Sequence, residues 1–371
     1  MKNRMHSRGR VAILALVAQL AGTELALGQW PTFTVGEPYD WEVSIPEEQG
    51  VDPQIVAEAL AAGEELPYLN ALLVVRNGVL IGERYYRDTQ PTDANTVLSV
   101  SKSFLSALFG IAEREDYLTL DQPMMDFFPD YVSAGMDRRK LDITLRHLLT
   151  MTSGFPYDDR DEHWSRWMPS EDWVGFCLEL PLDDDPGEVW HYSTCSTHIA
   201  SALLTRVSGM STLEFAQEYL FDPLGIPIGG WRRDPQGYYR GGWDMYFTPR
   251  DLARFGHLFR KKGKLDGQRI IPRKWVRKTT RTNVRGGNWG PIDRWGYGYW
   301  WWTGRGTEIH KMYFALGYGG QFVINIPKLK MTIVATADAN YDWGPAGDHV
   351  DAIVDLIGES LLEPLKDSGV R

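Results

Sequence analysis

Two groups of strand-like segments lie at opposite ends of this chain, and they constrain its fold more than any other feature. Near the start, residues 71–76, the dipeptide Asn77-Gly78 and residues 79–86 predict a β-hairpin with a type I′ turn. Near the end, segments rich in β-branched and aromatic residues predict antiparallel strands at 296–303, 312–316, 321–326 and 331–336. The long stretch between the two groups predicts mainly helices and loops. One sheet built from both ends of the chain therefore accounts for the pattern.

We therefore expect an α+β fold, in which helices flank an antiparallel sheet and a mainly helical lobe is inserted. Residues 29–125 and 281–371 are assigned to the sheet domain, and residues 126–280 to the helical lobe. The 371 residues are enough to bury a substantial core. Helices are predicted at 53–63, 99–114, 144–154, 197–209, 252–261 and 348–362.

The first 28 residues have the pattern of a signal peptide. Basic residues come first, an apolar run follows at 11–20, and Ala26-Leu27-Gly28 is a small-x-small cleavage site. The apolar run is too short to span a bilayer. We expect an exported protein, periplasmic or secreted, without a stable membrane anchor. Glu24 is unusual in this region, so an uncleaved anchor is the alternative.

Charge and cysteine usage exclude several classes of function. The 39 Lys and Arg residues face 49 Asp and Glu residues, which gives a net charge of −10 and argues against a nucleic-acid partner. The two cysteines, Cys177 and Cys195, could pair in an oxidising compartment or remain two buried thiols. No C-x-x-C or H-E-x-x-H motif occurs, so we expect no metal and no cofactor. The absence of G-x-S-x-G argues against an α/β-hydrolase nucleophile elbow.

The chain contains one S-x-x-K motif, Ser99-Val100-Ser101-Lys102, where an extended segment gives way to an apolar helix. Three residues are just under one helical turn, so Ser99 and Lys102 share a face. A serine needs a nearby base to become a nucleophile, and burial lowers the pKa of a lysine. The N–H at a helix start also favours a developing oxyanion. The alternative is that Ser99 only caps the helix and Lys102 is solvated.

Six sequence blocks together resemble the penicillin-recognising serine hydrolases, in the branch related to class C β-lactamases. That branch includes esterases, D-aminopeptidases and hydrolases of 6-aminohexanoate oligomers. The blocks occur in the family's order and are LSVSKS at 98–103, LTLD at 118–121 with FP at 128–129, ITLRHLLTMTSG at 143–154, PG at 186–187 with YS at 192–193, DLARFG at 251–256 and GYGG at 317–320. The resemblance implies a β-lactamase/transpeptidase-like fold, an α/β sandwich, over about residues 50–345.

The resemblance assigns three catalytic side chains. Ser99 matches the nucleophile, and Lys102 matches the lysine that activates it. Tyr192 matches the tyrosine of the family's Y-x-N element, whose phenol relays the proton to the leaving group. The alternative for Tyr192 is a half-buried aromatic residue that follows a Pro-Gly loop.

The resemblance also implies a second oxyanion donor. The family places a K-T-G or H-x-G element on an edge strand beside the serine, and residues 315–321 match this region. The N–H of Tyr318 would join that of Ser99, and Gly317 and Gly319 would let the backbone approach the substrate. The alternative is that these glycines form only a strand-entry turn.

Two departures from the family pattern point to the class of substrate. Thr194 stands where the Y-x-N element normally has asparagine, and no lysine occupies the K-T-G position that anchors a β-lactam carboxylate. We therefore expect a hydrolase of a small-molecule ester or amide. The alternatives are a β-lactamase or D,D-carboxypeptidase, and a non-catalytic binding module on the same fold.

An aromatic cluster precedes the last strands, and some of its rings are expected to line the acyl pocket. The alternative is that they form a stacked core. The cluster contains Trp289, Trp295, Tyr297, Tyr299, Trp300, Trp301 and Trp302.

Overall fold

The computed structural model describes residues 30–157, 161–287, 292–306, 310–341 and 348–367. The predicted signal peptide, residues 1–28, lies outside the described residues, as does Trp289.

An antiparallel sheet of eight strands forms the centre of one half of the molecule, in the order β3-β2-β14-β13-β12-β11-β10-β9. Strand β2 from the predicted hairpin pairs with β14 near the C-terminus, for example through Leu73 and Val334. This pairing confirms the α+β fold with a sheet built from both ends of the chain. The strands are β2 (Leu69–Arg76), β3 (Val79–Tyr85), β9 (Val284–Arg285), β10 (Ile292–Tyr297), β11 (Trp302–Gly306), β12 (His310–Gly317), β13 (Gln321–Ile326) and β14 (Met331–Ala337).

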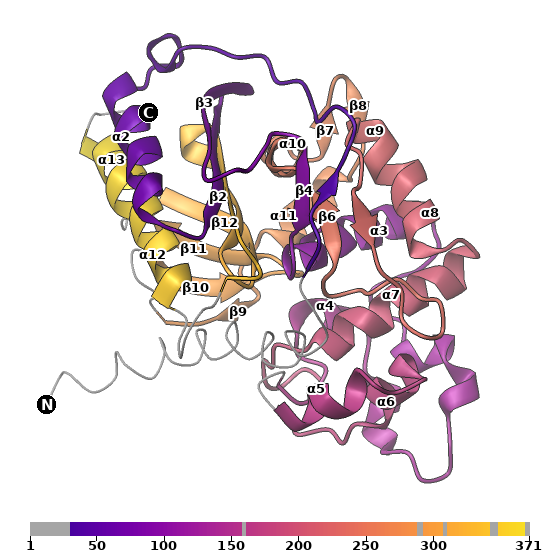
Figure 1. Ribbon diagram of the computed structural model, residues 1–371. Helices are drawn as coiled ribbons and strands as arrows, with labels where there is room; N and C mark the ends of the chain where they lie inside the picture. The colour runs from indigo at the N-terminus through magenta and orange to yellow at the C-terminus, as the bar shows by residue number, and fades with distance from the viewer. Residues whose placement is uncertain (1–29, 158–160, 288–291, 307–309, 342–347, 368–371) are drawn as a thin grey trace, which may run out of the picture.

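Helices cover both faces of this sheet (Figure 1). Helices α2 and α12 lie on one face, and α10 and α3 pack on the other. Because both faces are covered, every residue of β2 and β14 is buried. The helices are α2 (Pro53–Ala62), α3 (Val100–Arg114), α4 (Leu145–Thr150), α5 (Asp161–Trp167), α6 (Trp173–Glu179), α7 (Thr194–Ser208), α8 (Thr212–Ala216), α9 (Asp222–Leu224), α10 (Pro249–Arg260), α11 (Arg273–Thr279), α12 (Asp348–Ile357) and α13 (Glu363–Asp367).

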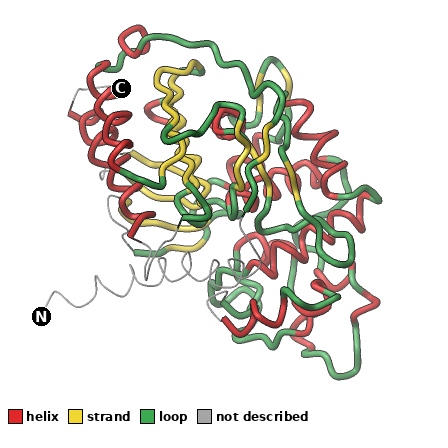
Figure 2. The backbone as a smooth tube through the Cα atoms, in the orientation of Figure 1, coloured by secondary structure: helices red, strands yellow, loops and turns green. Residues whose placement is uncertain are grey.

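Helices α4 to α8 gather beside the sheet, where Figure 2 shows few strands. Helix α7 is the centre of this group and packs against α4, α6, α8 and α3. Two short sheets complete the fold. The first has the order β1-β4-β6-β5, and the second pairs β7 with β8. Their strands are β1 (Phe33–Thr34), β4 (Asp93–Thr96), β5 (Gly230–Trp231), β6 (Met245–Phe247), β7 (Lys264–Leu265) and β8 (Gln268–Arg269).

Helix α10 connects the predicted helical lobe to the large sheet. It lies within residues 126–280, which were assigned to the helical lobe, yet it packs on β14, β13 and β2 of the large sheet. Most of its residues are buried, and Phe255 stacks on Phe104 of α3 with ring centroids 3.7 Å apart. The chain therefore contacts the sheet before residue 281, and the domain bounds stay a prediction.

The predicted strand at 296–303 is wrong, because this segment is the end of one strand, a turn and the start of another. Strand β10 ends at Tyr297 and β11 begins at Trp302. Between them, Trp300 adopts a left-handed conformation with φ 56°. Gly298 is packed so tightly that a Cβ there would lie 1.9 Å from the carbonyl oxygen of Thr279. This contact with the end of α11 turns the chain before it can continue as a strand.

Residue chemistry explains where the helices around the site begin and end. Thr144 caps α4 with a capping box, and Thr248 caps α10 by accepting a hydrogen bond from the N–H of Asp251. Gly209 ends α7 with φ 72°. Helix α4 ends earlier than predicted, because Met151 already takes the left-handed conformation, with φ 58°, three residues before Gly154.

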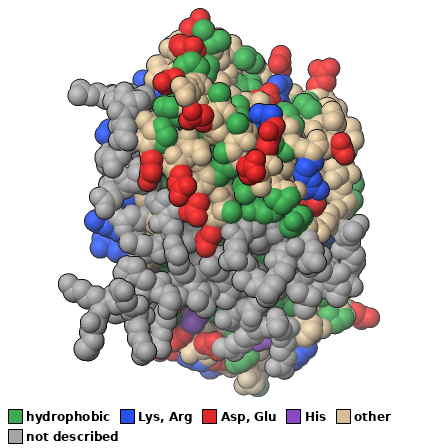
Figure 3. All heavy atoms as spheres, turned by 60° about the vertical axis from the view of Figure 1, so that its left-hand side comes forward, with side chains coloured by type: hydrophobic (Ala, Val, Ile, Leu, Met, Phe, Trp, Pro, Cys, Tyr) green, Lys and Arg blue, Asp and Glu red, His purple; other side chains and the backbone are tan. Residues whose placement is uncertain are grey.

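The surface has an acidic character in keeping with the sequence. On the face shown in Figure 3, acidic side chains are spread over the upper part, with basic side chains among them. The exclusion of a nucleic-acid partner stays a prediction. Among the described residues, no helix combines the length and apolar character needed to cross a bilayer.

His257 on α10 makes the stability of the sheet half depend on pH. Burial, followed by the charges of Arg260, Lys261 and Arg254, lowers the pKa of its imidazole to about 3. Below pH 6.5 the His257 imidazole binds a proton in the unfolded chain but not in the folded protein. The free energy of unfolding therefore decreases as the pH is lowered. The loss reaches about 3 kcal/mol by pH 4.5. Urea unfolding at pH 7 and pH 4.5 is expected to show a smaller drop for His257→Gln than for wild type, and equal drops would contradict this assignment.

Candidate active site

Ser99 lies at a sharp turn between β4 and α3. Val97 continues β4 by donating its N–H to the carbonyl of Met245 at 2.9 Å. The next residue, Leu98, has φ 46°, which is uncommon for a residue with a side chain and marks a strained turn. The Ser99 side chain does not cap α3. Its hydroxyl instead lines a pocket, so the capping alternative for Ser99 does not describe this site.

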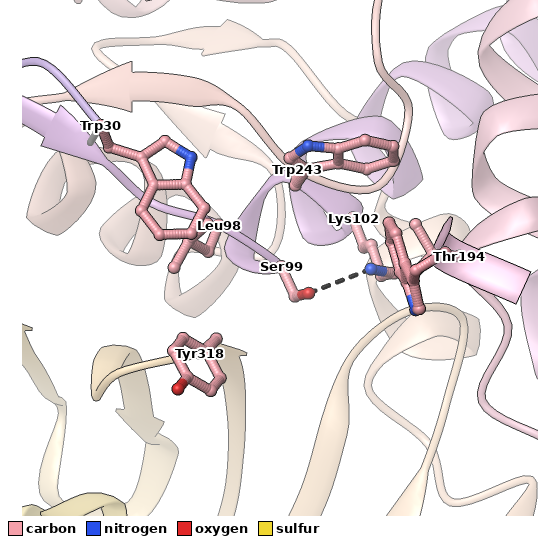
Figure 4. Close-up of a pocket in the computed structure, with 8 residues that line it drawn as sticks. Trp30, Leu98, Ser99, Lys102, Thr194, Trp243 and Tyr318 are labelled. Atoms are coloured by element: carbon pink, nitrogen blue, oxygen red, sulfur yellow. Dashed lines mark hydrogen bonds between the residues drawn. The ribbon is translucent and has the colours of Figure 1, made fainter. Parts of the chain in front are cut away.

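Lys102 lies one turn into α3 and is buried, with 1% of its surface exposed. Its Nζ donates hydrogen bonds to Ser99 Oγ at 3.0 Å and to the carbonyl oxygen of Gly242 at 2.9 Å. The structure thus brings together the serine and the lysine of the S-x-x-K motif, as Figure 4 shows. The alternative of a solvated Lys102 is excluded by this burial.

Tyr192 reaches the same place from the loop before α7. Lys102 Nζ lies 4.8 Å from the centre of the Tyr192 ring. The ring is buried and stacks on Trp302, with centroids 6.1 Å apart. The structure therefore brings the third predicted catalytic residue against the lysine, although Tyr192 lies about ninety residues further along the chain.

Several contacts fix the loop that carries Tyr192. His191 donates its N–H to the carbonyl of Met151 at 2.8 Å, and Ser193 donates to the sulfur of Met151 at 3.4 Å. Ser193 also caps α7 by accepting a hydrogen bond from Ser196. Cys177 and Cys195 form a disulfide that joins α6 to the first turn of α7, which decides between the paired and free alternatives for these cysteines.

Gly317 is the last residue of β12, and Tyr318 and Gly319 follow it. Tyr318 lines the same pocket as Leu98 and Ser99. Strand β12 is interior rather than an edge strand, because it pairs with both β11 and β13. The ladder with β11 stops at Trp302 and Phe314, however, so residues 315–317 extend beyond it. The expected edge therefore exists only at this end of β12, where β11 has already turned away.

Glycine is required where β12 meets the serine turn. A Cβ on Gly317 would lie 2.4 Å from the carbonyl oxygen of Val97. Gly319 and Gly320 both have positive φ, at 73° and 95°. The turn they form leads into β13, so the glycines do form a strand-entry turn, as the alternative reading of this segment predicts. It also holds Tyr318 on the wall of the Ser99 pocket. Burial raises the pKa of the Tyr318 phenol, which keeps it protonated.

The space around Ser99, including the part that is open to solvent, is about 310 Å³. Figure 4 shows Ser99 at its centre, with Lys102 and Thr194 on one side and Leu98 on the other. The predicted residues Ser99, Lys102, Thr194 and Tyr318 all line it. Three tryptophans that also line the pocket were not predicted from the sequence, namely Trp30, Trp164 and Trp243.

The predicted aromatic cluster mostly packs in the interior. Trp300 and Trp301 are almost fully buried in the core, and Trp302 supports the Tyr192 ring from behind. The core alternative therefore describes Trp300 and Trp301. The tryptophans that line the pocket come from other parts of the chain, and no local pattern in the sequence distinguished them.

Gly242 is a second site residue that sequence reasoning missed. Besides accepting a hydrogen bond from Lys102, it leaves no room for a side chain. A Cβ there would lie 2.4 Å from Thr194 Cγ2 and 3.1 Å from Lys102 Nζ. The following Asp244 is fully buried and accepts hydrogen bonds from Arg232 and Arg240, which pin the loop. The paired glycines at 241 and 242, followed by Trp243, were the signal in the sequence.

Gly242→Ala is expected to lower kcat/KM by about 100-fold, because a shift of about 1 Å in a catalytic group has that effect. The new methyl group would displace the Lys102 ammonium or the loop that orients it. Gly135→Ala is the matched control, since a Cβ there meets nothing within 4 Å. Equal activities of the two variants in an ester-hydrolysis assay would show that Gly242 does not position Lys102.

Among the described residues, no group of three or more His, Cys, Asp or Glu side chains could hold a metal ion. The arrangement offers instead a serine hydroxyl and a buried amine in one pocket, with the Tyr192 ring beside the amine. Such a set can attack a carbonyl and move the proton without a metal.

Comparison with known proteins agrees with this geometry. The 6-aminohexanoate-dimer hydrolase of Paenarthrobacter ureafaciens is 25% identical over 225 residues, which cover 56% of each chain. The lovastatin esterase of Penicillium rubens is 30% identical over 162 residues, which cover 38% of this chain and 40% of the esterase. The chain thus matches only about half of these relatives' length.

A solved structure from Bacillus anthracis, assigned as a 6-aminohexanoate-dimer hydrolase, has the same fold. Its TM-score is 0.71 at 18% identity, and 94% of each chain is covered. The sequence profile of the beta-lactamase family matches residues 70–356. The resemblance inferred from the six sequence blocks is thereby confirmed, and this chain belongs to the beta-lactamase family.

Proposed function

We propose that this protein is a serine hydrolase that cleaves a small-molecule ester or amide through an acyl-enzyme on Ser99. The observation that carries the proposal is the 3.0 Å hydrogen bond between the buried Nζ of Lys102 and Ser99 Oγ at the wall of a pocket. A buried amine beside a hydroxyl is a proton acceptor placed where a serine nucleophile needs one.

The carbonyl of Gly242 gives Lys102 the right orientation for this role. When the amine is neutral, the Nζ–Oγ hydrogen bond runs from the hydroxyl to the amine, and Ser99 donates its O–H to the Nζ lone pair. One N–H of the amine still donates to the Gly242 carbonyl, 2.9 Å away. The lone pair is therefore held toward Ser99 rather than toward Gly242.

The reaction proceeds in two halves. Ser99 Oγ attacks the carbonyl carbon of the substrate while its proton passes to Lys102. The oxyanion accepts hydrogen bonds from the N–H groups of Ser99 and Tyr318. Tyr192, beside Lys102, relays the proton to the leaving alkoxide or amine, and the acyl group stays on Ser99. In the second half, Tyr192 and Lys102 remove a proton from water, which attacks the acyl-enzyme and releases the acid.

The lining of the pocket supports an ester or amide substrate over a β-lactam. Among the described lining residues, Lys102 is the one charged side chain, and it is engaged with Ser99 and Gly242. The position at which relatives anchor a β-lactam carboxylate is occupied by the Tyr318 segment. A carboxylate buried in this pocket would lack a cationic partner of its own, which disfavours it.

A substrate panel tests this proposal against the alternatives. We expect turnover of p-nitrophenyl esters and of an anilide, and little turnover of nitrocefin. Nitrocefin turnover that exceeds ester turnover would favour a β-lactamase. Tight binding of an ester without release of acid would favour a non-catalytic binding module.

We also propose that the protein is exported. The disulfide between Cys177 and Cys195 supports an oxidising compartment, where such bonds persist. Mass spectrometry of protein purified from the periplasm or medium is expected to give a chain that lacks residues 1–28. An intact N-terminus in cytosolic protein alone would contradict export.

A further inference from the structure

The segment that precedes β1 brings a tryptophan to the Ser99 pocket. Trp30 has 5% of its surface exposed and lines the pocket together with Leu98 and Ser99. Strand β1 follows three residues later and pairs with β4, the strand that leads to Ser99. In Figure 4 the Trp30 ring lies beside Leu98, across Ser99 from Lys102.

One asparagine side chain holds Trp30 in this place. The N–H of Trp30 donates to Asn340 Oδ1 at 2.6 Å, and Asn340 Nδ2 donates to the carbonyl of Trp30 at 2.9 Å. The N–H of Asn340 in turn donates to Asp338 at 2.8 Å. A single amide therefore clamps both backbone groups of Trp30 across 310 positions of sequence. Such a two-point clamp fixes the position of the ring more tightly than either hydrogen bond alone.

Trp30 also borders a second, polar cavity. This second space, about 750 Å³ including the part that is open to solvent, also has Trp30 in its wall. Its other walls include Arg87, Asp88, Asp93 and Asp338. Trp30 therefore lines both the mainly apolar space beside the serine and this charged space.

The side of Ser99 on which Trp30 lies identifies the part of the substrate that it contacts. In the proposed reaction, Lys102 and Tyr192 handle the proton of the leaving group, so the leaving group lies on their side of Ser99. Trp30 lies across Ser99 from Lys102. The acyl group, which stays bonded to Ser99, therefore extends toward Trp30 and Leu98.

We propose that Trp30 determines acyl specificity and that the enzyme selects uncharged, apolar acyl groups with a flat or aromatic body. This inference rests on the proposed function. An aromatic acyl group gains from stacking on the tryptophan and from leaving water. The same ring keeps charged or strongly polar acyl groups out of the space beside Ser99, because they find no partner there.

The test compares p-nitrophenyl benzoate with p-nitrophenyl acetate, so that only the acyl group changes. We expect wild type to prefer the benzoate in kcat/KM. Trp30→Ala is expected to lower kcat/KM for the benzoate by about tenfold or more, and to leave the acetate within about threefold, in line with the discrimination that apolar pocket contacts provide. Equal losses on both esters would mean that Trp30 is merely structural, and would overturn the proposal.

The clamp gives a second variant in which the tryptophan itself is kept. Asn340→Ala is expected to shift the benzoate-to-acetate ratio in the same direction as Trp30→Ala. The double variant is expected to shift it no further than Trp30→Ala alone, because both changes act through the same ring. Trp231→Ala is the matched control, since Trp231 is similarly buried, at 8%, and does not line the pocket. A shift as large in this control would overturn the assignment to Trp30.

A binding measurement separates this inference from the proposed function. Benzamide is an uncharged, slowly hydrolysed probe. Calorimetry is expected to show that wild type binds benzamide more tightly than acetamide. In Trp30→Ala this difference in affinity is expected to disappear. If this holds while no ester is turned over, the proposed function fails and the specificity pocket stands. If esters are turned over and neither ratio changes in Trp30→Ala, the function stands and this inference fails.

Discussion

Ser99→Ala is expected to lower kcat/KM for p-nitrophenyl esters by at least about ten-thousand-fold, because removal of a nucleophile leaves only the binding and oxyanion contributions to catalysis. The pocket itself should survive, since the Ser99 side chain does not cap α3 and carries no part of the core. The folded state is therefore expected to be as stable as wild type. Steady-state kinetics and thermal unfolding of the same preparation check both expectations.

Ser101→Ala is the matched control for this variant. Ser101 lies two residues further along α3, is fully buried, and accepts a hydrogen bond from the N–H of Met245 at 3.3 Å. Ser101→Ala is expected to lower the free energy of unfolding and to leave the activity of each folded molecule unchanged. Activity that survives in Ser99→Ala but disappears in Ser101→Ala would show that Ser101, rather than Ser99, is the nucleophile.

Lys102→Met is expected to lower kcat/KM by about a thousand-fold, within the range that general-base catalysis contributes. Methionine fills much of the same buried volume but cannot accept the proton of Ser99. Lys102→Arg sharpens the test, because a guanidinium keeps the positive charge and the hydrogen-bond donors but cannot give up its proton. We expect Lys102→Arg to be as inactive as Lys102→Met. Recovery of activity in the arginine variant would show that charge, rather than proton transfer, is the role of Lys102.

Lys140→Met controls for the loss of a buried lysine. Lys140 is 3% exposed and donates to the carbonyl of Leu178 at 2.6 Å, in a different pocket among the helices. Its replacement is expected to leave kcat/KM within about threefold of wild type, as for other changes outside a catalytic site. A loss as large as that of Lys102→Met would point to a general effect on folding.

The parts of this protein that could be predicted from sequence are those determined locally. The Asn77-Gly78 turn between two strand-like segments specifies a hairpin without reference to distant residues. Ser99 and Lys102 are three residues apart on one helix, so their proximity follows from helix geometry alone. Tyr192 is different, because only the resemblance to a family placed it near this pair.

The parts that could not be predicted depend on long-range packing. Gly242 meets Lys102 across 140 positions, and Trp30 meets Asn340 across 310 positions. Neither contact leaves a periodic pattern in the sequence. The predicted strand at 296–303 failed for the same reason, because the turn at Trp300 is imposed by the end of α11. The resemblance predicts an edge position for β12, and the structure provides one only where β11 turns away.

Labelling with a fluorophosphonate, followed by peptide mass spectrometry, tests the central claim most directly. The reagent bonds irreversibly to an activated serine, and so reports both the residue and its activation. We expect one phosphonyl group, located on Ser99, with ester hydrolysis lost in proportion to labelling. Labelling of any other residue, or complete labelling that leaves hydrolysis intact, would contradict the account.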